Sequence, residues 1–426
     1  MKAILIICAA AVLMAGLAGL SQPGLRGAAS GIAVSVGRKS YRAASPSLRV
    51  ALDHAVEVGS PGCNASAFAQ VPGALSQFIG RQLITEDGKL AGVSGANDCS
   101  GGKPGNEAIG RPFNRWGLVL DRFDWTKKTF SIVKSILDTS IDPATGVSKA
   151  VITGGRLRGA IIRSAYDPDM VVYKGMYLVA FECTLENGVR FGVRGTSSCV
   201  GRYDPDRRAM DMRQIDVAVT EHRQGSTIYA ASVPRLLVFA GKLYLYWSSL
   251  TIRQGRLVLS AERGVEMAMG ADGFHPKLVG NRPLHAMDSL SVEVWAPQAG
   301  TMNDTVVNVF ALKPVGRSIL VYAALGGSGC GVPSDRSKGC FRLAIVRSAT
   351  PLAHHAFNDA KALDIPLPSN PQEYTIPVTD PAGGKWLLGH YIRPPSNGFS
   401  EKNPVPSPSF WRNRSAGSAL VMYPVS

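Results

Sequence analysis

The sequence is poor in the patterns that mark helical folds, metal centres and nucleophilic hydrolases. Beyond residue 20, only a short piece at 47–58 suggests an amphipathic helix. No Cys-x-x-Cys or His-x-x-x-His spacing occurs, and the adjacent His354 and His355 cannot easily face one ion, so we expect no metal site and no cofactor. The Gly-x-Ser-x-Gly elbow of serine hydrolases is also missing. The remaining features of the sequence are short strands and carboxylates, which point to a β fold.

Only the N-terminus carries a long apolar run. Lys2 precedes the apolar segment 3–12, and small residues follow from Ala15 to Ala18. This order is typical of a secretory signal peptide, which we place at 1–20 with cleavage just after Ala18. An uncleaved anchor is the alternative, because a run of ~18 apolar residues approaches the spanning length. No later segment could cross a bilayer, so we expect a secreted or periplasmic protein with no membrane span after cleavage.

The cysteines agree with an oxidising compartment. One of the seven lies in the N-terminal apolar run, and an even set remains in the mature chain. Six cysteines allow many pairings, and we expect neighbours in the sequence to pair: Cys63 with Cys99, Cys183 with Cys199, and Cys330 with Cys340. Closing a loop of ~15 residues is worth about 3 kcal/mol. Such disulfides would staple loops rather than create the core.

The charge is strongly positive. The formal net charge of +15 suits an acidic polysaccharide, peptidoglycan, an anionic membrane surface or nucleic acid as a partner, although a generally basic solvated surface is the simpler alternative. Arg and Lys are scattered along the chain rather than gathered in a stripe, which argues against nucleic acid. The segment 21–75 is rich in Gly, Ala and Ser, and we expect a partly ordered lead-in, tied to the domain through Cys63.

A sequence motif recurs along the chain. It reads DPDMVVYKGMYLVAF from Asp167, VPRLLVFAGKLYLYW from Val233 and, more loosely, DTVVNVFALKPVGRSILVY from Asp304. Each copy holds two short apolar runs around a Gly-containing turn, which is a β-hairpin signal. Recurring hairpins of this kind suggest the blades of a β-propeller.

A second sequence motif supports the repeat. RWGLVLDR, RFGVRGTS, RLVLSAER and RLAIVRSA begin at Arg115, Arg190, Arg256 and Arg342. Pro168 and Pro234 are 66 residues apart, so a unit of roughly 70 residues fits about five times. We therefore predict an all-β fold, a single five-bladed β-propeller at 76–426 with disulfide-stapled loops, which we expect to be a monomer. The blades are expected near 76–160, 161–225, 226–295, 296–365 and 366–426, with extra loops on one face.

The copy that begins at Asp167 resembles the first-blade signature of the five-bladed propeller glycosidases of glycoside hydrolase family 43 and the related fructan-cleaving families. The match lies in the Asp-Pro pair and in the Gly and Tyr-rich strand after it, within Tyr166 to Phe181. The resemblance implies hydrolysis of glycosidic bonds in a plant or microbial polysaccharide by two carboxylates. A non-catalytic propeller that binds an anionic glycan, or a protein at the cell envelope, is the alternative.

The resemblance places three positions of the site. Asp167 matches the family's general base, although an Asx-type turn before Pro168 would also explain it. The second family carboxylate is replaced by Arg235, and a cation there would hold neighbouring carboxylates ionised. The place of the third acid holds Asp304, with Glu293 as a weaker candidate.

Other side chains are candidates for sugar contacts. Arg235 could clamp an anionic sugar, or form an ion pair with Asp167 or Asp169. Among the aromatic residues expected near the axis, Tyr166 and Trp247 are the favoured stacking partners, although core packing would explain them too. The remaining candidates near the axis are Trp295, Trp411, His275, His285 and His390, and no spacing selects one of the histidines.

Overall fold

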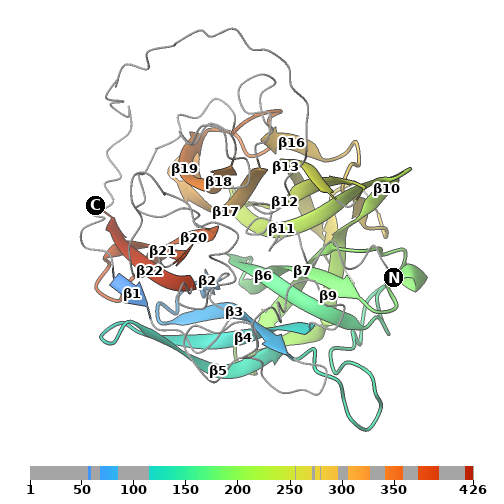
Figure 1. The fold of residues 1–426 in the computed structure, drawn as a ribbon, viewed down its shortest axis with the longest axis horizontal. Helices are drawn as coiled ribbons and strands as arrows, with labels where there is room; N and C mark the ends of the chain where they lie inside the picture. The colour runs from blue at the N-terminus through green and yellow to red at the C-terminus, as the bar shows by residue number, and fades with distance from the viewer. Residues whose placement is uncertain are drawn as a thin grey trace, which may run out of the picture.

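The computed structural model describes residues 56–58, 68–84, 115–254, 256–270, 274–278, 280–295, 306–326, 341–357, 373–392 and 418–425. These residues form five β-sheets arranged as blades around one axis (Figure 1), as the recurring hairpins predict. A short 3-10 helix, η3 (Gly188–Phe191), follows the second strand of blade 2. The predicted five-bladed propeller is confirmed.

Blades 1 and 2 each contain four strands that run antiparallel from the axis outward. Blade 1 consists of β2 (Phe68–Gln70), β3 (Gln77–Ile84), β4 (Arg115–Asp124) and β5 (Thr129–Leu137). Blade 2 consists of β6 (Ile162–Tyr173), β7 (Met176–Leu185), β8 (Ser197–Asp204) and β9 (Ala209–Thr220). The later strand β15 (Leu284–His285) pairs parallel to β9 at the outer edge of blade 2.

Blades 3 and 4 continue the ring. Blade 3 consists of β10 (His222–Gln224), β11 (Thr227–Phe239), β12 (Lys242–Arg253), β13 (Arg256–Met269), β14 (Phe274–Pro276) and β16 (Val292–Trp295). Blade 4 consists of β17 (Val306–Val315), β18 (Ser318–Gly326) and β19 (Phe341–Ser348). The three copies of the recurring motif form the hairpins β6–β7, β11–β12 and β17–β18. Each copy is therefore the inner half of one blade.

The last blade joins both ends of the chain. It consists of β20 (Glu373–Thr379), β21 (Lys385–Ile392), β22 (Ser418–Val425) and the early strand β1 (Val56–Val58), which pairs antiparallel with β22. The Gln70 side chain donates to the Thr379 carbonyl (2.9 Å) and accepts from its amide (3.1 Å), which links blades 5 and 1. Strands β1 and β2 both precede residue 76, so sheet pairing starts inside the segment expected as a lead-in.

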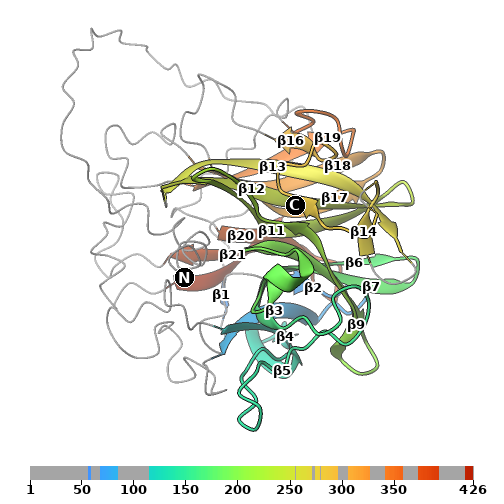
Figure 2. The ribbon, with the colours of Figure 1, turned by 90° about the vertical axis from the view of Figure 1, so that its right-hand side faces the viewer.

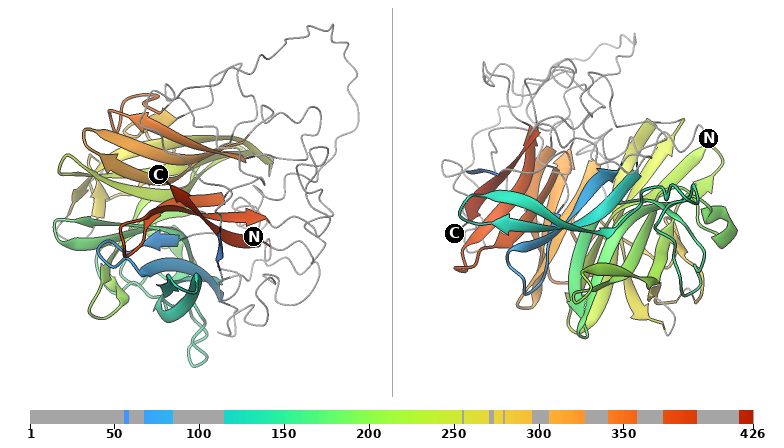
Figure 3. Two further views of the ribbon diagram at one scale, coloured as in Figure 1. Left: turned by 90° about the vertical axis from the view of Figure 1, so that its left-hand side faces the viewer. Right: turned by 90° about the horizontal axis from the view of Figure 1, so that it is seen from below.

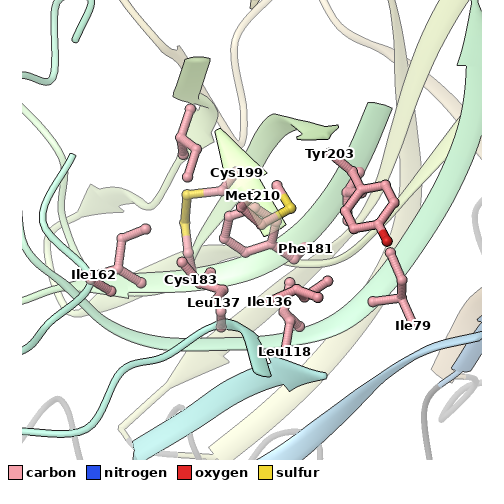
Figure 4. Close-up of a cluster of buried hydrophobic side chains, with 14 of the residues drawn as sticks. Ile79, Leu118, Ile136, Leu137, Ile162, Phe181, Cys183, Cys199, Tyr203 and Met210 are labelled. Carbon is pink, nitrogen blue, oxygen red and sulfur yellow. A yellow bond between two sulfur atoms is a disulfide. The ribbon is translucent and has the colours of Figure 1, made fainter. Parts of the chain in front are cut away.

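Apolar side chains fill the spaces between neighbouring blades. Figure 4 shows the cluster between blades 1 and 2, where Ile79 and Leu118 meet Phe181 and the buried disulfide between Cys183 and Cys199. This disulfide joins β7 to β8 and confirms one predicted pairing. The four cysteines of the other two predicted pairs lie outside the described residues.

Candidate active site

The innermost strands are bulged at matching positions. The pairing register shifts between Tyr166 and Asp169 in β6, and between Ser232 and Arg235 in β11. Asp167 and Val233 sit in these bulges with positive φ angles of 52° and 48°. A left-handed conformation is unusual for any residue with a side chain and is strained for a β-branched valine. Bulges re-aim backbone and side chains next to active sites, so the axis of blades 2 and 3 is where a site is expected.

Polar side chains on second strands hold the inner strand of the next blade. The contacts are Arg81 with Asp167, Glu182 with Ser232 and Val233, and Ser248 with Asn308. They run from blade 1 to 2, from blade 2 to 3 and from blade 3 to 4. A set of buried polar contacts therefore surrounds the axis and follows the order of the repeat.

Asp167 is completely buried and ion-paired. Its Oδ1 lies 3.1 Å from Nη1 of Arg81, and the side chain has no exposed surface. The Arg81 guanidinium also lies over the ring of Trp116, 4.8 Å from its centroid. A buried carboxylate needs such a cation, because an unpaired charge in a protein interior is very costly.

Glu182 lies beside Asp167, on the strand paired with β6. It is directly opposite Tyr166 in the β6–β7 ladder, and its Oε2 accepts hydrogen bonds from Ser232 Oγ and from the Val233 amide (2.9 Å). Burial is the main cause that raises the pKa of Glu182 to about 7, and the negative charge of Asp167 adds to it. The nearby hydroxyl of Tyr166 lowers the pKa of Glu182 and opposes the shift. Glu182 can thus hold a proton near neutral pH.

Arg235, which takes the place of the second family carboxylate, binds backbone oxygens of three blades. Nη1 donates to the carbonyls of Asp167 (3.0 Å) and Pro234 (2.8 Å), and Nε donates to that of Val309 (3.1 Å). The side chain is 2% exposed. Its observed hydrogen bonds therefore join β6, β11 and β17 at the axis.

The charge of Arg235 acts on two further buried carboxyl groups, those of Asp169 and Glu262. Asp169 accepts a hydrogen bond from the Leu236 amide (2.7 Å), and burial raises its pKa while the charge of Arg235 lowers it. Glu262, on β13, accepts from Ser248 Oγ (3.0 Å). Burial raises the pKa of Glu262 to about 8, although the hydrogen bond from Ser248 and the charge of Arg235 both oppose the shift. The axis thus combines two cations with several buried carboxyl groups, of which Glu182 and Glu262 have pKa values raised by burial.

The other predicted site residues are spread through the fold. Trp247 has no exposed surface and packs with apolar side chains between blades 2 and 3. Glu293 lies on the outer strand β16, where its Oε2 is 3.7 Å from Nη1 of Arg263. Asp304 lies outside the described residues. The structure therefore brings Tyr166, Asp167, Asp169 and Arg235 together, but places Glu293 and Trp247 elsewhere.

The remaining aromatic and histidine candidates that the structure describes lie in different parts of the fold. Trp295 packs against Phe357 in the core, and His275 contacts Asp216 through Nδ1 at 3.3 Å. His285 lies next to His222. Trp411 and the side chain of His390 lie outside the description. Within the described part of the chain, no three His, Cys, Asp or Glu side chains are grouped so that they could hold a metal ion.

Sequence reasoning missed Glu182 and Glu262. Glu182 is the single carboxylate of the apolar strand β7, MYLVAFECTL, whereas Glu262 shares β13, RLVLSAERGVEMAM, with Glu266. Acidic residues are rarely buried without a partner, so an isolated glutamate in such a run is a usable signal. Their position at the axis, however, depends on the pairing of β7 and β13 with neighbouring strands.

Comparison with known proteins gives a likeness of fold. No family model matches the chain, and no curated protein matches it significantly. Solved structures similar to it include the endo-arabinase from Bacteroides thetaiotaomicron, with 9% identity, a TM-score of 0.45, and coverage of 89% of this chain and 98% of that one. A GH43 endo-arabinanase from Bacillus licheniformis follows, with 11% identity, a TM-score of 0.40, and coverage of 86% and 95%.

A third similar structure is a family 117 glycoside hydrolase from the marine bacterium Zobellia galactanivorans, with 10% identity, a TM-score of 0.43, and coverage of 89% and 90%. The resemblance to family 43 glycosidases expected from the sequence is thus also found among solved structures. With identities of 9–11% and TM-scores below 0.5, these matches assign no activity to this chain.

Proposed function

We propose that this protein hydrolyses glycosidic bonds, with Asp167 and Glu182 as its central carboxyl pair. The observation that carries the proposal is their opposite electrostatic setting. Asp167 is ion-paired with Arg81, whereas burial and the charge of Asp167 raise the pKa of Glu182 to about 7. Glycoside hydrolysis needs one carboxylate that accepts a proton or attacks the sugar, and one carboxylic acid that donates a proton to the leaving oxygen.

The roles follow from these settings. Asp167, ionised beside Arg81, acts as the base that activates water, and Glu182 gives its proton to the departing oxygen. The strained bulges at Asp167 and Val233 fix both groups, because the amide of Val233 donates to Glu182. Both carboxyl groups are buried, so the proposal requires the axial side chains to rearrange when a sugar enters.

The proposal also covers the substrate and the cellular compartment of the protein. We expect a plant or microbial polysaccharide, acted on by an exported monomer. Endo-arabinases are among the structural neighbours, which suggests arabinan as the first substrate to try. Uronate-containing polysaccharides follow from the net charge of +15.

The test is sugar release from arabinan, xylan, fructan and uronate-containing polysaccharides. Wild-type protein is expected to release sugar from one of them. Asp167→Asn and Glu182→Gln are each expected to lower the rate by at least about 100-fold, in line with general acid and base catalysis. Glu293→Gln is the matched control, because that carboxylate lies on the outer strand β16. Unchanged activity in Asp167→Asn would remove the proposal.

A non-catalytic glycan-binding propeller is the second candidate, and the burial of the axis favours it. Asp167 and Glu182 have 0% and 1% exposure, and their partners are other side chains and backbone groups of the protein. Such a network can serve structure alone. Binding to one polysaccharide without any released sugar, unaffected by Glu182→Gln, would support this candidate.

A further inference from the structure

The blades expose their hairpin turns on one face of the propeller, here called the turn face. In each blade the turns after the first strand and, where present, after the third strand lie on this face, because successive strands run antiparallel. Figures 2 and 3 show these strand ends side by side along one side of the ring. The turns of neighbouring blades touch: Lys128 Nζ of blade 1 lies 4.9 Å from the Trp386 ring of blade 5.

The turn face is basic. Its described turns and strand ends carry ten Lys and Arg side chains and five Asp and Glu side chains. The basic residues are Lys127, Lys128, Lys174, Arg207, Arg208, Lys242, Lys277, Arg317, Arg347 and Lys385. The acidic residues are Asp124, Asp204, Asp206, Glu266 and Asp380. Several acids pair with cations of the same face, Glu266 with Lys242 and Lys277, Asp124 with Lys127, and Asp204 with Arg207, and ten basic less five acidic residues leaves five positive charges. A net positive surface remains.

Apolar side chains project among these cations. Three of the eight large hydrophobic residues that the described part of the chain exposes lie at the turn face. They are Leu75, Val172 and Val315, with exposed fractions of 37%, 39% and 42%. A groove of about 360 Å³ also opens between the turns of blades 3 and 4, with Phe239 and Pro314 in its lining and Arg317 among its residues.

We propose that the turn face docks on an anionic lipid bilayer. Basic residues near such a surface each strengthen binding roughly fivefold, and exposed aliphatic side chains can enter the boundary between headgroups and acyl chains. Neither feature explains the other, so two independent observations agree. Exposed aliphatic side chains gain more from the apolar boundary of a bilayer than from a soluble polyanion, which is why lipid is favoured over an acidic polysaccharide. The docked protein keeps its opposite face turned to the solvent.

The experiment measures binding of the full chain to vesicles of phosphatidylcholine alone and of phosphatidylcholine mixed with phosphatidylglycerol. Wild-type protein is expected to bind the mixed vesicles and to be released by salt. Lys174→Glu with Arg317→Glu is expected to weaken this binding by at least about 10-fold. Arg190→Glu with Arg253→Glu is the matched control, because it changes the net charge equally at exposed residues outside the turn face. Thermal unfolding shows that each variant is folded.

A second pair of variants tests the apolar part. Val315→Ser is expected to weaken binding several-fold without changing the charge, whereas Val133→Ser, with a similar exposed fraction of 38% in the middle of β5 and away from the turn face, is not. All variants keep the N-terminal apolar run, so it cannot produce the difference. The proposal is overturned if wild-type protein ignores the mixed vesicles, if it binds both vesicle types equally, or if the two charge-reversal variants behave alike. It is also overturned if heparin, a soluble polyanion, is bound and vesicles are not.

Discussion

The guanidinium of Arg81 in blade 1 forms a buried ion pair with Asp167, the residue that stands in the bulge of β6 in blade 2. Asp167 holds a positive φ of 52°, which costs free energy unless the surroundings fix it. The ion pair supplies that constraint from the neighbouring blade. The same relationship recurs one blade later, where Glu182 accepts from the amide of Val233 in the next bulge.

Removing the cation of this pair should be strongly destabilising. Arg81→Met removes the ion pair of the buried Asp167 carboxylate, so we expect the free energy of unfolding to fall by about 3–5 kcal/mol. Adding Asp167→Asn should recover part of the loss, because asparagine is neutral and also tolerates a positive φ. Urea unfolding of both single variants and the double variant gives the coupling energy. Additive losses would show that the two side chains do not act as a pair.

The sequence predicted the architecture because the repeat is local. Each copy of the motif contains its own turn and its own pair of strands. The hairpins β6–β7 and β11–β12 could therefore be located from the spacing of the motif along the sequence alone. The pairing of β1 with β22 in the last blade could not be located in this way. Val56–Val58 is too short to show a period, and its partner β22 lies at the other end of the chain.

The candidate site was predicted only in part, for a related reason. Asp167 and Arg235 could be found because each lies beside the proline of the recurring motif. What Arg235 binds is set by backbone carbonyls that the bulges turn toward it, and these carbonyls come from three blades. Local sequence carries no record of such convergence, and the same holds for the burial of Glu182.

Arg235 should matter for stability through its backbone contacts. Arg235→Met removes the donors of three carbonyl oxygens, so we expect a loss of about 3 kcal/mol or more in the free energy of unfolding. Arg235→Lys should recover little, since one ammonium cannot replace the fork of the guanidinium. Urea unfolding measures both. If stability stayed unchanged while polysaccharide binding fell, the guanidinium would be a ligand group instead.

The disulfide between Cys183 and Cys199 should stabilise the folded chain by restricting the unfolded one. The two cysteines are 16 residues apart, and closing a loop of that size contributes about 3 kcal/mol. Replacing both by alanine should lower the free energy of unfolding by a similar amount. Reduction of the wild type should have the same effect, and mass spectrometry should show a gain of two hydrogens for this pair. Equal stability of reduced and oxidised protein would contradict the prediction.

Asp121 should lower stability rather than add to it. Its side chain is fully buried, and neither carboxyl oxygen has a hydrogen-bond partner within the described structure. Burial raises its pKa well above the usual value, so its cost to folding grows as the pH rises above that value. Asp121→Leu should raise the free energy of unfolding at neutral pH by about 1–3 kcal/mol, and by less at pH 4. Asp206→Ser, at an exposed turn, is the control and should change little. A large loss of stability in Asp121→Leu would reveal a partner that the fold requires.

Glu182 should make stability fall as the pH rises toward neutrality. Its pKa is raised from 4.5 to about 7, so between these values the folded protein keeps a proton that the unfolded chain has lost. The stabilisation is complete below the lower value and is lost as the pH rises through the higher one, at roughly 1.4 kcal/mol per pH unit for this group. Glu182→Gln should flatten this slope in urea unfolding measured from pH 5 to 7.

Asp167 offers an internal check on the same experiment. Its negative charge is one cause of the raised pKa of Glu182, after burial. In Asp167→Asn that repulsion is gone, so the pKa of Glu182 should fall and the pH window should shorten from its upper end. Glu262→Gln is the matched comparison, because the pKa of Glu262 is raised to about 8 by burial and Asp167 is not among the causes. The coupling of Glu182 to Asp167 would be refuted if Asp167→Asn left the slope assigned to Glu182 unchanged up to pH 7.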